Sequence, residues 1–268
     1  MDGTLASILP LDLYRQLGGA SAPAVADLRP PTNGGRLIAA AVPVAPDALD
    51  RWVARLPQQQ TVVVYGDGDD VARRVAGQLK GAGLSAAYLA GGFAAWTEAG
   101  LPTRRNIGPT GKWVTRERPK IDRIACPWLI SRFIDPGAEF IYVPPATVVS
   151  VAKQTGGIPY DIEGVKFAHE GERCSFDTIL RIFDIHDPAL DHLAVIVRGA
   201  DTSRHDLTPQ CGGLFAISLG LSANFADDHE MLRHGLVMYD ALYTWCRSLQ
   251  DETHNWPSVK QPTQAAAS

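Results

Sequence analysis

Short apolar runs alternate with helical patterns through the first hundred residues. The β-branched run TVVVY at 61–65 is typical of a buried parallel strand, and residues 85–89 are predicted to form another strand. Between them, Val71, Val75 and Leu79 repeat at helical spacing and predict the core face of a helix. This alternation predicts an α/β fold, with a parallel sheet that flanking helices cover on both faces.

The second half of the chain has a different pattern. Asp122 lies directly before a predicted helix at 124–133, and the apolar run at 193–197 is predicted to be a strand. Residues 229–249 carry two neighbouring apolar stripes at helical spacing, which predict a long helix buried on much of its surface. These elements predict a second α/β domain that is mixed and rich in helices.

Length and composition suggest how the chain is divided. Its 268 residues suggest about two domains at roughly 150 residues each. The segment LPTRRNIGPTGKWVTRER at 101–118 contains two prolines and two glycines, as expected of a connection. From 104 to 123, seven Lys or Arg face two acids, so this strip is either a solvated connector or an anion-attracting surface. We predict a first domain, a linker, a second domain and a mobile tail at 1–104, 105–118, 119–250 and 251–268.

Charge and hydropathy argue against several classes of partner. The 25 Lys and Arg against 29 Asp and Glu give a net charge of −4, so no global basic field favours nucleic acid. No apolar stretch approaches the ~20 residues of a membrane helix, and the N-terminus lacks a signal-peptide pattern. The four cysteines are scattered and form no CxxC pair, as expected of reduced thiols. We therefore expect a cytoplasmic protein with no membrane partner.

Three segments of the first domain carry a resemblance to a known family. They are DLR at 27–29, VVVY at 62–65 and LAGGFAAW at 89–96, and together they are similar to single rhodanese-like domains. The resemblance implies a cysteine directly after the strand, where backbone N–H groups and the helix dipole lower its pKa. Gly66 occupies that position, and the carboxylates of DGDD at 67–70 repel anionic sulfur donors. We expect an inactive module used for structure or for docking a protein partner, with sulfurtransferase activity through a thiol from elsewhere as an alternative.

The second domain carries a resemblance of its own. Segments including KIDRIACPWLISRF at 120–133, GVKFAHEGERCSFD at 164–177 and LAVIVRGADTSRHDL at 193–207 resemble the ChrB-type chromate-resistance domain. The resemblance implies a role in bacterial chromate resistance, as a sensor, regulator or accessory factor for a small oxyanion such as chromate or a phosphate-like ion. In regulatory members the segment before this domain is thought to bind DNA. A rhodanese-like fold stands there instead, so a DNA-binding regulator is an alternative that we do not favour.

Carboxylates and one imidazole of the second domain form a candidate metal site. Asp122 precedes a predicted helix, Asp161 and Asp201 follow predicted strands, and His169 follows an apolar stretch. Such groups converge at the carboxyl edge of a parallel sheet, and an oxygen-rich set with one imidazole suits Mn, Fe or Zn. Ordinary interpretations are a helix cap for Asp122, a turn for Asp161 and a structural role for His169. The order loosely resembles metal-dependent phosphoesterases, so such a hydrolase is an alternative function.

Arginines and cysteines supply a second set of candidates. Guanidinium groups match tetrahedral oxyanions, so Arg123, Arg132 and Arg173 are candidate oxyanion-binding residues. Cys126 and Cys174 lie near arginines in the sequence, and cationic neighbours lower a thiol pKa. These two are the candidate thiols if a cysteine senses or reduces an oxyanion. The sequence leaves open whether the domain is an enzyme.

Overall fold

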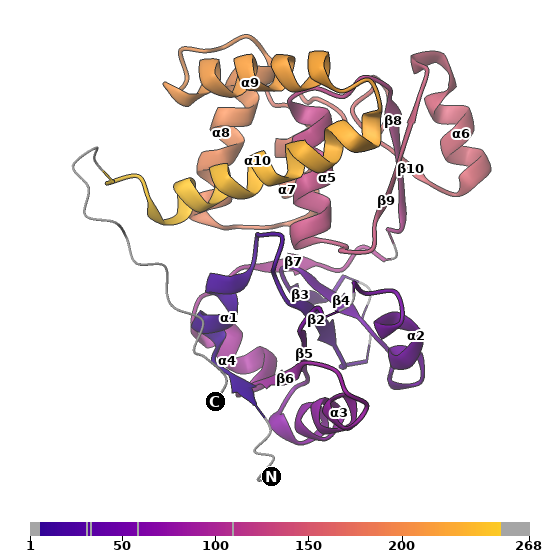
Figure 1. The fold of residues 1–268 in the computed structure, drawn as a ribbon, viewed down its shortest axis with the longest axis vertical. Helices are drawn as coiled ribbons and strands as arrows, with labels where there is room; N and C mark the ends of the chain where they lie inside the picture. The colour runs from indigo at the N-terminus through magenta and orange to yellow at the C-terminus, as the bar shows by residue number, and fades with distance from the viewer. Residues whose placement is uncertain (1–5, 31, 33, 58, 109, 253–268) are drawn as a thin grey trace.

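The computed structural model describes residues 6–252 apart from 31, 33, 58 and 109 (Figure 1). All but the first two residues of the predicted tail at 251–268 lie outside the described residues. The strands are β1 (Ser7–Ile8), β2 (Ala24–Asp27), β3 (Arg36–Ile38), β4 (Ala41–Pro43), β5 (Val62–Tyr65), β6 (Ala86–Leu89), β7 (Thr103–Arg105), β8 (Lys112–Arg116), β9 (Glu139–Val143) and β10 (Ile158–Pro159). The helices are α1 (Pro10–Gln16), α2 (Leu49–Val53), α3 (Asp69–Gly81), α4 (Gly92–Glu98), α5 (Asp122–Phe133), α6 (Val148–Thr155), α7 (Ser175–Phe183), α8 (Pro188–Asp201), α9 (Gln210–Asn224) and α10 (Asp228–Ser248), with short 3-10 turns at Pro46–Ala48 and Pro145–Thr147.

The N-terminal domain is built on a five-stranded parallel sheet in the order β1-β6-β5-β2-β4. Helices α2 and α3 pack on one face and α1 and α4 on the other, where Trp96 is completely buried. The predicted parallel sheet with helices on both faces is therefore confirmed. One detail differs, because Val71 is 43% exposed and Ala72 takes its place beside Val75 and Leu79 in the core.

The predicted linker is not a structureless connection. Within 101–118, β7 pairs antiparallel with β3 of the N-terminal domain. Strand β8 pairs parallel with both β9 and β10 and forms the centre of the second domain's sheet. Most of the described residues of this segment therefore belong to the two short strands or lie directly beside them.

The second domain places most of its helices on one side of the β10-β8-β9 sheet. Helix α6 packs on one face, while α5, α7, α8 and α10 form a large core with the other (Figure 1). The predicted strand at 193–197 is wrong, since these residues lie inside α8. Asp187 caps α8 by accepting hydrogen bonds from two backbone N–H groups, and Pro188 is the first helical residue. A short apolar run does not by itself distinguish a buried strand from a buried helix.

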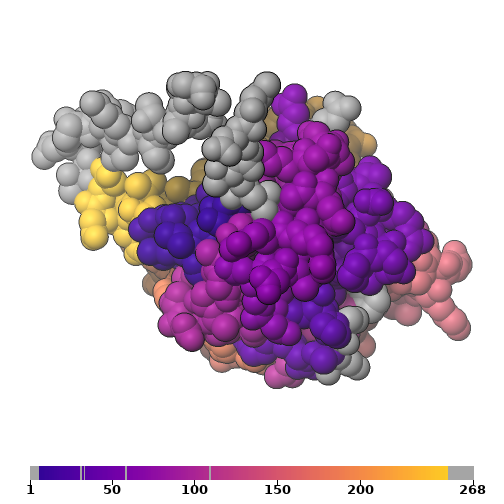
Figure 2. Space-filling view, turned by 90° about the horizontal axis from the view of Figure 1, so that it is seen from below, coloured from indigo at the N-terminus to yellow at the C-terminus, as the bar shows by residue number. Residues whose placement is uncertain are grey.

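The long C-terminal helix is as predicted. Helix α10 begins after Asp227, whose side chain accepts a hydrogen bond from the backbone N–H of Glu230. Near its C-terminal end, Arg247 donates hydrogen bonds to the carbonyl oxygens of Tyr14 and Leu17 at the end of α1. The helix therefore spans the second domain and contacts the first. In Figure 2, which looks from the side of the N-terminal domain, that domain fills most of the view. Within the described ranges, no helix has the length and apolar character needed to cross a membrane.

Candidate functional site

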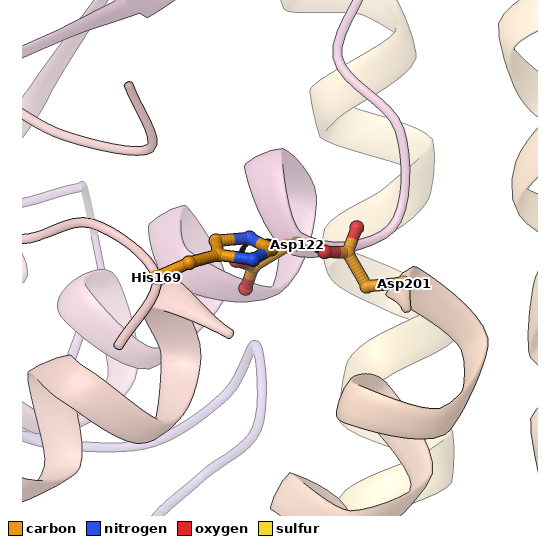
Figure 3. A group of neighbouring side chains, drawn as sticks. All are labelled: Asp122, His169 and Asp201. Atoms are coloured by element: carbon orange, nitrogen blue, oxygen red, sulfur yellow. Dashed lines mark ion pairs between the residues drawn. The ribbon is translucent and has the colours of Figure 1, made fainter. Parts of the chain in front are cut away.

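Four side chains that are far apart in the sequence meet in the second domain. The Nε2 atom of His169 lies 3.2 Å from Oδ2 of Asp201 and 3.5 Å from Oδ2 of Asp122. It lies 3.3 Å from Oδ1 of Asp161. Figure 3 shows the side chains of Asp122, His169 and Asp201 together, with the imidazole directed toward the carboxylates. The structure thus brings together all four residues that the sequence analysis selected as metal ligands.

Two of these carboxylates occupy helix ends, which corrects the predicted positions. Asp122 is the first residue of α5 and does not lie before that helix. Asp201 is the last residue of α8, so it does not follow a strand. Asp161 and His169 lie in the segment between β10 and α7. The site therefore forms where two helix ends meet a loop, beside the small parallel sheet.

Asp122 is held in place by the beginning of α7. Its side chain is 1% exposed, and its oxygens accept hydrogen bonds from the backbone N–H groups of Ser175 (2.7 Å) and Phe176 (3.0 Å). The carboxylate therefore lies at the positive end of α7 and does not cap its own helix. Burial raises the pKa of Asp122 to about 6, although its contact with His169 acts in the opposite direction.

Asp161 is ionised and neutralised by two arginines. Its φ of 51° lies in the left-handed region, and its Oδ1 accepts a hydrogen bond from the hydroxyl of Ser175. Its Oδ2 lies 2.9 Å from Nη2 of Arg116 and 3.3 Å from Nε of Arg123. Burial alone would raise its pKa, but the contact with His169 and the two guanidinium groups outweigh burial and lower it.

His169 is the most accessible member of the group. Its side chain is 41% exposed, and that of Asp201 is 19% exposed. Contacts with Asp122, Asp161 and Asp201 raise the pKa of His169 to about 12, and partial burial opposes this shift. Without a metal ion, the imidazolium is therefore the countercharge of the surrounding carboxylates.

The spacing of three of these residues fits the ligand set of a divalent ion. Asp122, His169 and Asp201 each offer one ligand atom, and these atoms all lie within 4.8 Å of one another. Around an ion with bonds of ~2.1 Å, neighbouring ligand atoms lie about 3.0–3.4 Å apart. The distances from the imidazole nitrogen to the two carboxylates, 3.2 and 3.5 Å, are close to that spacing. Asp161 lies outside the group of three and orients its neighbours.

Only one of the three candidate oxyanion-binding arginines lies at this site. Arg123 contacts Asp161, whereas Arg132 donates to Asp240 on α10 and joins two helices. Arg173 is exposed and lines a separate cavity of about 320 Å³ beside α7 and α8. The sequence analysis did not select Arg116, the second arginine at Asp161. Its place at the end of the KWVTR strand is the signal that could have identified it.

The expectation that arginines lower the pKa of the two candidate thiols is wrong. Cys126 and Cys174 are completely buried. Burial raises both thiol pKa values, and the negative charge of Asp122 raises them further. The thiol of Cys126 donates a hydrogen bond to Asp122 at 3.2 Å. Neighbours in the sequence were a poor guide here, because Arg123 contacts Asp161 and the side chain of Arg173 is exposed.

The arginines of the basic strip at 104–123 make contacts within the molecule. Arg104 is 4% exposed and donates to the carbonyl oxygens of Ala41 and Ile134, one in each domain. Arg118 donates to carbonyl oxygens at the end of α9 and the segment that follows it. Much of the positive charge that favoured an anion-attracting surface is therefore used to hold elements together.

The loop after β5, where the resemblance implies a catalytic cysteine, is closely packed. Gly66 follows β5, and its carbonyl oxygen accepts a hydrogen bond from the backbone N–H of Phe93. Gly92 has a φ of +58°, and a Cβ there would lie 2.4 Å from the carbonyl oxygen of Gly66. Beside this loop, a cavity of about 240 Å³ is lined by residues that include Arg29 and Asp67. The sequence places no cysteine before Cys126.

Comparison with known proteins identifies both halves of the chain. Residues 113–246 match the ChrB C-terminal domain, and residues 9–99 match the rhodanese-like domain. Protein ChrB of Cupriavidus metallidurans is 30% identical over 134 residues, which make up 50% of this chain and 40% of that protein. The chain therefore matches less than half the length of that relative.

Solved structures similar to this chain include two rhodanese-like proteins. A rhodanese-related protein from Thermoplasma volcanium is 25% identical, with 36% of this chain and 95% of that chain covered and a TM-score of 0.31. A rhodanese-like domain from Anabaena sp. is 27% identical, with 40% of this chain and 87% of that chain covered and a TM-score of 0.34.

Proposed function

The chain belongs to the family of the ChrB C-terminal domain, and we propose that it is a chromate-resistance protein that binds a divalent metal ion and an oxyanion. In this proposal it acts in the cytoplasm as a sensor or accessory factor, attached to an inactive rhodanese-like module. The observation that carries the proposal is the position of His169, whose Nε2 lies within 3.5 Å of carboxylate oxygens from three separate segments.

The proposed metal ligands are Asp122, His169 and Asp201. Two carboxylates and one imidazole suit Mn, Fe or Zn, and the partial exposure of His169 gives an ion a path from solvent. A bound ion would supply positive charge that attracts an oxyanion. Asp122 would keep its orientation through the two backbone N–H groups of α7 described above.

Arg116 and Arg123 are the proposed oxyanion-binding groups. Two guanidinium groups contact the single carboxylate of Asp161, so the arginine charge of the site is concentrated on this side. The Nε atom of Arg116 is buried and has no hydrogen-bond partner among the described residues. The side chain as a whole is 38% exposed, so the guanidinium group can meet an anion from solvent, and its geometry suits a tetrahedral dianion such as chromate or phosphate.

The inactive state of the rhodanese-like module is proposed from its loop. Gly66 stands where the resemblance implies the catalytic thiol, and Asp67 and Asp69 follow it closely. The state of the cysteines is consistent with the reducing cytoplasm, because all four are free and buried.

Metal analysis tests the first part of the proposal. Protein loaded with Mn²⁺, Fe²⁺ or Zn²⁺ and then dialysed should retain one of these ions stoichiometrically, and His169→Ala should lose it. His186→Ala is the matched control, because His186 is 79% exposed and pairs with Asp184 outside the site. Absence of retained metal in the wild type, or equal retention in His169→Ala, would contradict the proposal.

Calorimetric titration with chromate and with phosphate tests the second part. Arg116→Gln in the metal-loaded protein should weaken anion binding by at least about tenfold, since charge-assisted hydrogen bonds are lost. Arg181→Gln is the control, because Arg181 is half-exposed and pairs with Glu170. Equal affinities in wild type and Arg116→Gln would remove the oxyanion part and leave the metal part standing.

A further inference from the structure

The residue before Asp122 has a strained backbone. Ile121 has a φ of 38° and a ψ of −97°, a region that L residues avoid and that β-branched residues avoid most strongly. Such conformations persist only where the surroundings hold them, and they gather at functional sites. Asp161, a second residue of the same site, also has a positive φ. The strain at Ile121 lies directly before a proposed metal ligand.

The carbonyl group of Ile121 is the point at which this conformation is held. Its oxygen accepts hydrogen bonds from the backbone N–H groups of Ala125 (2.8 Å) and Ile124 (3.1 Å), which form the first turn of α5. It accepts a third from the hydroxyl of Tyr239 at 3.0 Å. Tyr239 is completely buried and belongs to α10. The third bond therefore ties the strained residue to a different element.

Close packing makes this connection between α5 and α10 rigid. A Cβ at Gly235, one turn before Tyr239, would lie 2.4 Å from Cγ2 of Ile124. Farther along the two helices, Asp240 accepts hydrogen bonds from Nε1 of Trp128 and from Arg132. Because α5 and α10 are joined at two levels, the hydroxyl of Tyr239 acts from a fixed position.

The direction of the Asp122 side chain depends on the peptide that joins it to Ile121. Rotation of that peptide would move the carboxylate away from the N–H groups of α7 and away from His169. We propose that Tyr239 is a positioning residue for the metal site, whose hydroxyl holds the backbone of Ile121 so that Asp122 points at His169. This inference rests on the proposed function, because it concerns the metal-binding role of Asp122.

Removal of one hydroxyl group tests the inference. Mn²⁺ affinity is measured from the electron paramagnetic resonance signal of the free ion, and thermal unfolding is followed in EDTA. Tyr239→Phe should weaken Mn²⁺ binding by about 10–100-fold, the usual effect of losing a group that orients a ligand. Tyr243→Phe is the matched control, since Tyr243 lies one turn later on α10, is completely buried and donates to Asp187. This control should bind Mn²⁺ within about twofold of the wild type.

The outcomes separate positioning from a general structural role. A lower unfolding temperature in both variants with weaker Mn²⁺ binding only in Tyr239→Phe supports the inference. Equal affinities in wild type and Tyr239→Phe, or equal weakening in both variants, overturn it while the proposed function stands. A wild type that binds no Mn²⁺, Fe²⁺ or Zn²⁺ overturns the proposed function and this inference together.

A second variant tests the role of the strain itself. Glycine adopts a positive φ without strain. In the Ile121→Gly variant, the backbone at position 121 should therefore depend less on the hydrogen bond from the Tyr239 hydroxyl. In the Ile121→Gly background, Tyr239→Phe should therefore weaken Mn²⁺ binding by a smaller factor than in the wild-type background. The same factor in both backgrounds would show that the hydroxyl does not act through Ile121, and would overturn the inference.

Discussion

Replacement of Asp187 should show how firmly the two domains are joined. This residue is completely buried where they meet. Its Oδ1 accepts hydrogen bonds from the backbone N–H groups of Ala189 and Leu190 and so caps α8. Its Oδ2 accepts the hydroxyl groups of Tyr14 from the N-terminal domain at 2.8 Å and Tyr243 from α10 at 3.2 Å. One carboxylate therefore links three elements and both domains.

The cost of Asp187→Ala can be built from these contacts. Loss of the cap costs about 1 kcal/mol. The Tyr243 hydroxyl is left buried without a partner, at a cost of about 1–3 kcal/mol, whereas the half-buried Tyr14 hydroxyl costs about 0–1 kcal/mol because it can reach water. These terms sum to about 2–5 kcal/mol of unfolding free energy. In a chain of this size, that lowers the Tm by about 4–20 °C. Asp187→Ser keeps a capping oxygen and should cost about 1 kcal/mol less.

Urea unfolding followed by circular dichroism, together with thermal melts, measures these differences. We expect one transition in the wild type, because the buried polar contacts make the domains unfold together. Asp187→Asn is a further control, because asparagine has the same shape as aspartate. Its amide oxygen can still cap α8, and its NH2 group can donate a hydrogen bond to a tyrosine hydroxyl oxygen. A loss below about 1 kcal/mol for Asp187→Ala would refute the reasoning, as would equal losses for the alanine and serine variants.

Three further predictions address the imidazole, the rhodanese-like loop and the helix contact. The pKa of His169 is raised to about 12, so its stabilisation is complete below the unfolded value of ~6.5 and is lost as pH rises toward 12. In EDTA, the stability gap between wild type and His169→Gln should therefore be smaller at pH 10 than at pH 6, and urea titrations showing a constant gap would contradict this. Gly66→Cys should fold, because an added Cβ meets nothing closer than 3.4 Å, yet a thiosulfate:cyanide assay should stay at background, since nearby carboxylates raise a thiol pKa; clear activity would count against the proposed inactive loop. Gly235→Ala should lose about 1–3 kcal/mol in urea unfolding through overpacking against Ile124, whereas Gly220→Ala, which meets nothing within 4 Å, should lose nothing; equal effects would show that the close approach does not matter.

The sheet of the N-terminal domain could be predicted because its apolar runs favour a strand over a helix. TVVVY at 61–65 is β-branched and bounded by turn residues, so a buried strand is the structure it favours, and β5 lies there. The apolar run at 193–197 has no such bias, and tertiary packing makes it part of a buried helix. Asp187 and Pro188 were the signals for that helix, because a capping residue followed by proline marks a helix start.

The chemistry of the candidate site was easier to predict than its surroundings. Asp122, Asp161, His169 and Asp201 were selected by residue type, and the fold brings all four together. Several of the hydrogen bonds that hold them come from backbone N–H groups and from Ser175, which carry no pattern in the sequence, and Asp161 is also held by Arg116. The predicted direction of the thiol pKa shifts was wrong for the same reason, because a pKa depends on the groups that are close in space and not on those that are close in the sequence.

Helix α8 connects the contact with the N-terminal domain to the candidate site. Its first turn is capped by Asp187, which the N-terminal domain holds through Tyr14, and its last residue is Asp201 at the candidate site. The 14 residues of the helix span about 21 Å between these two points. A second contact, between Arg36 of β3 and Asp184, holds the loop just before α8. The N-terminal domain therefore contacts the start of the helix whose last residue belongs to the candidate site.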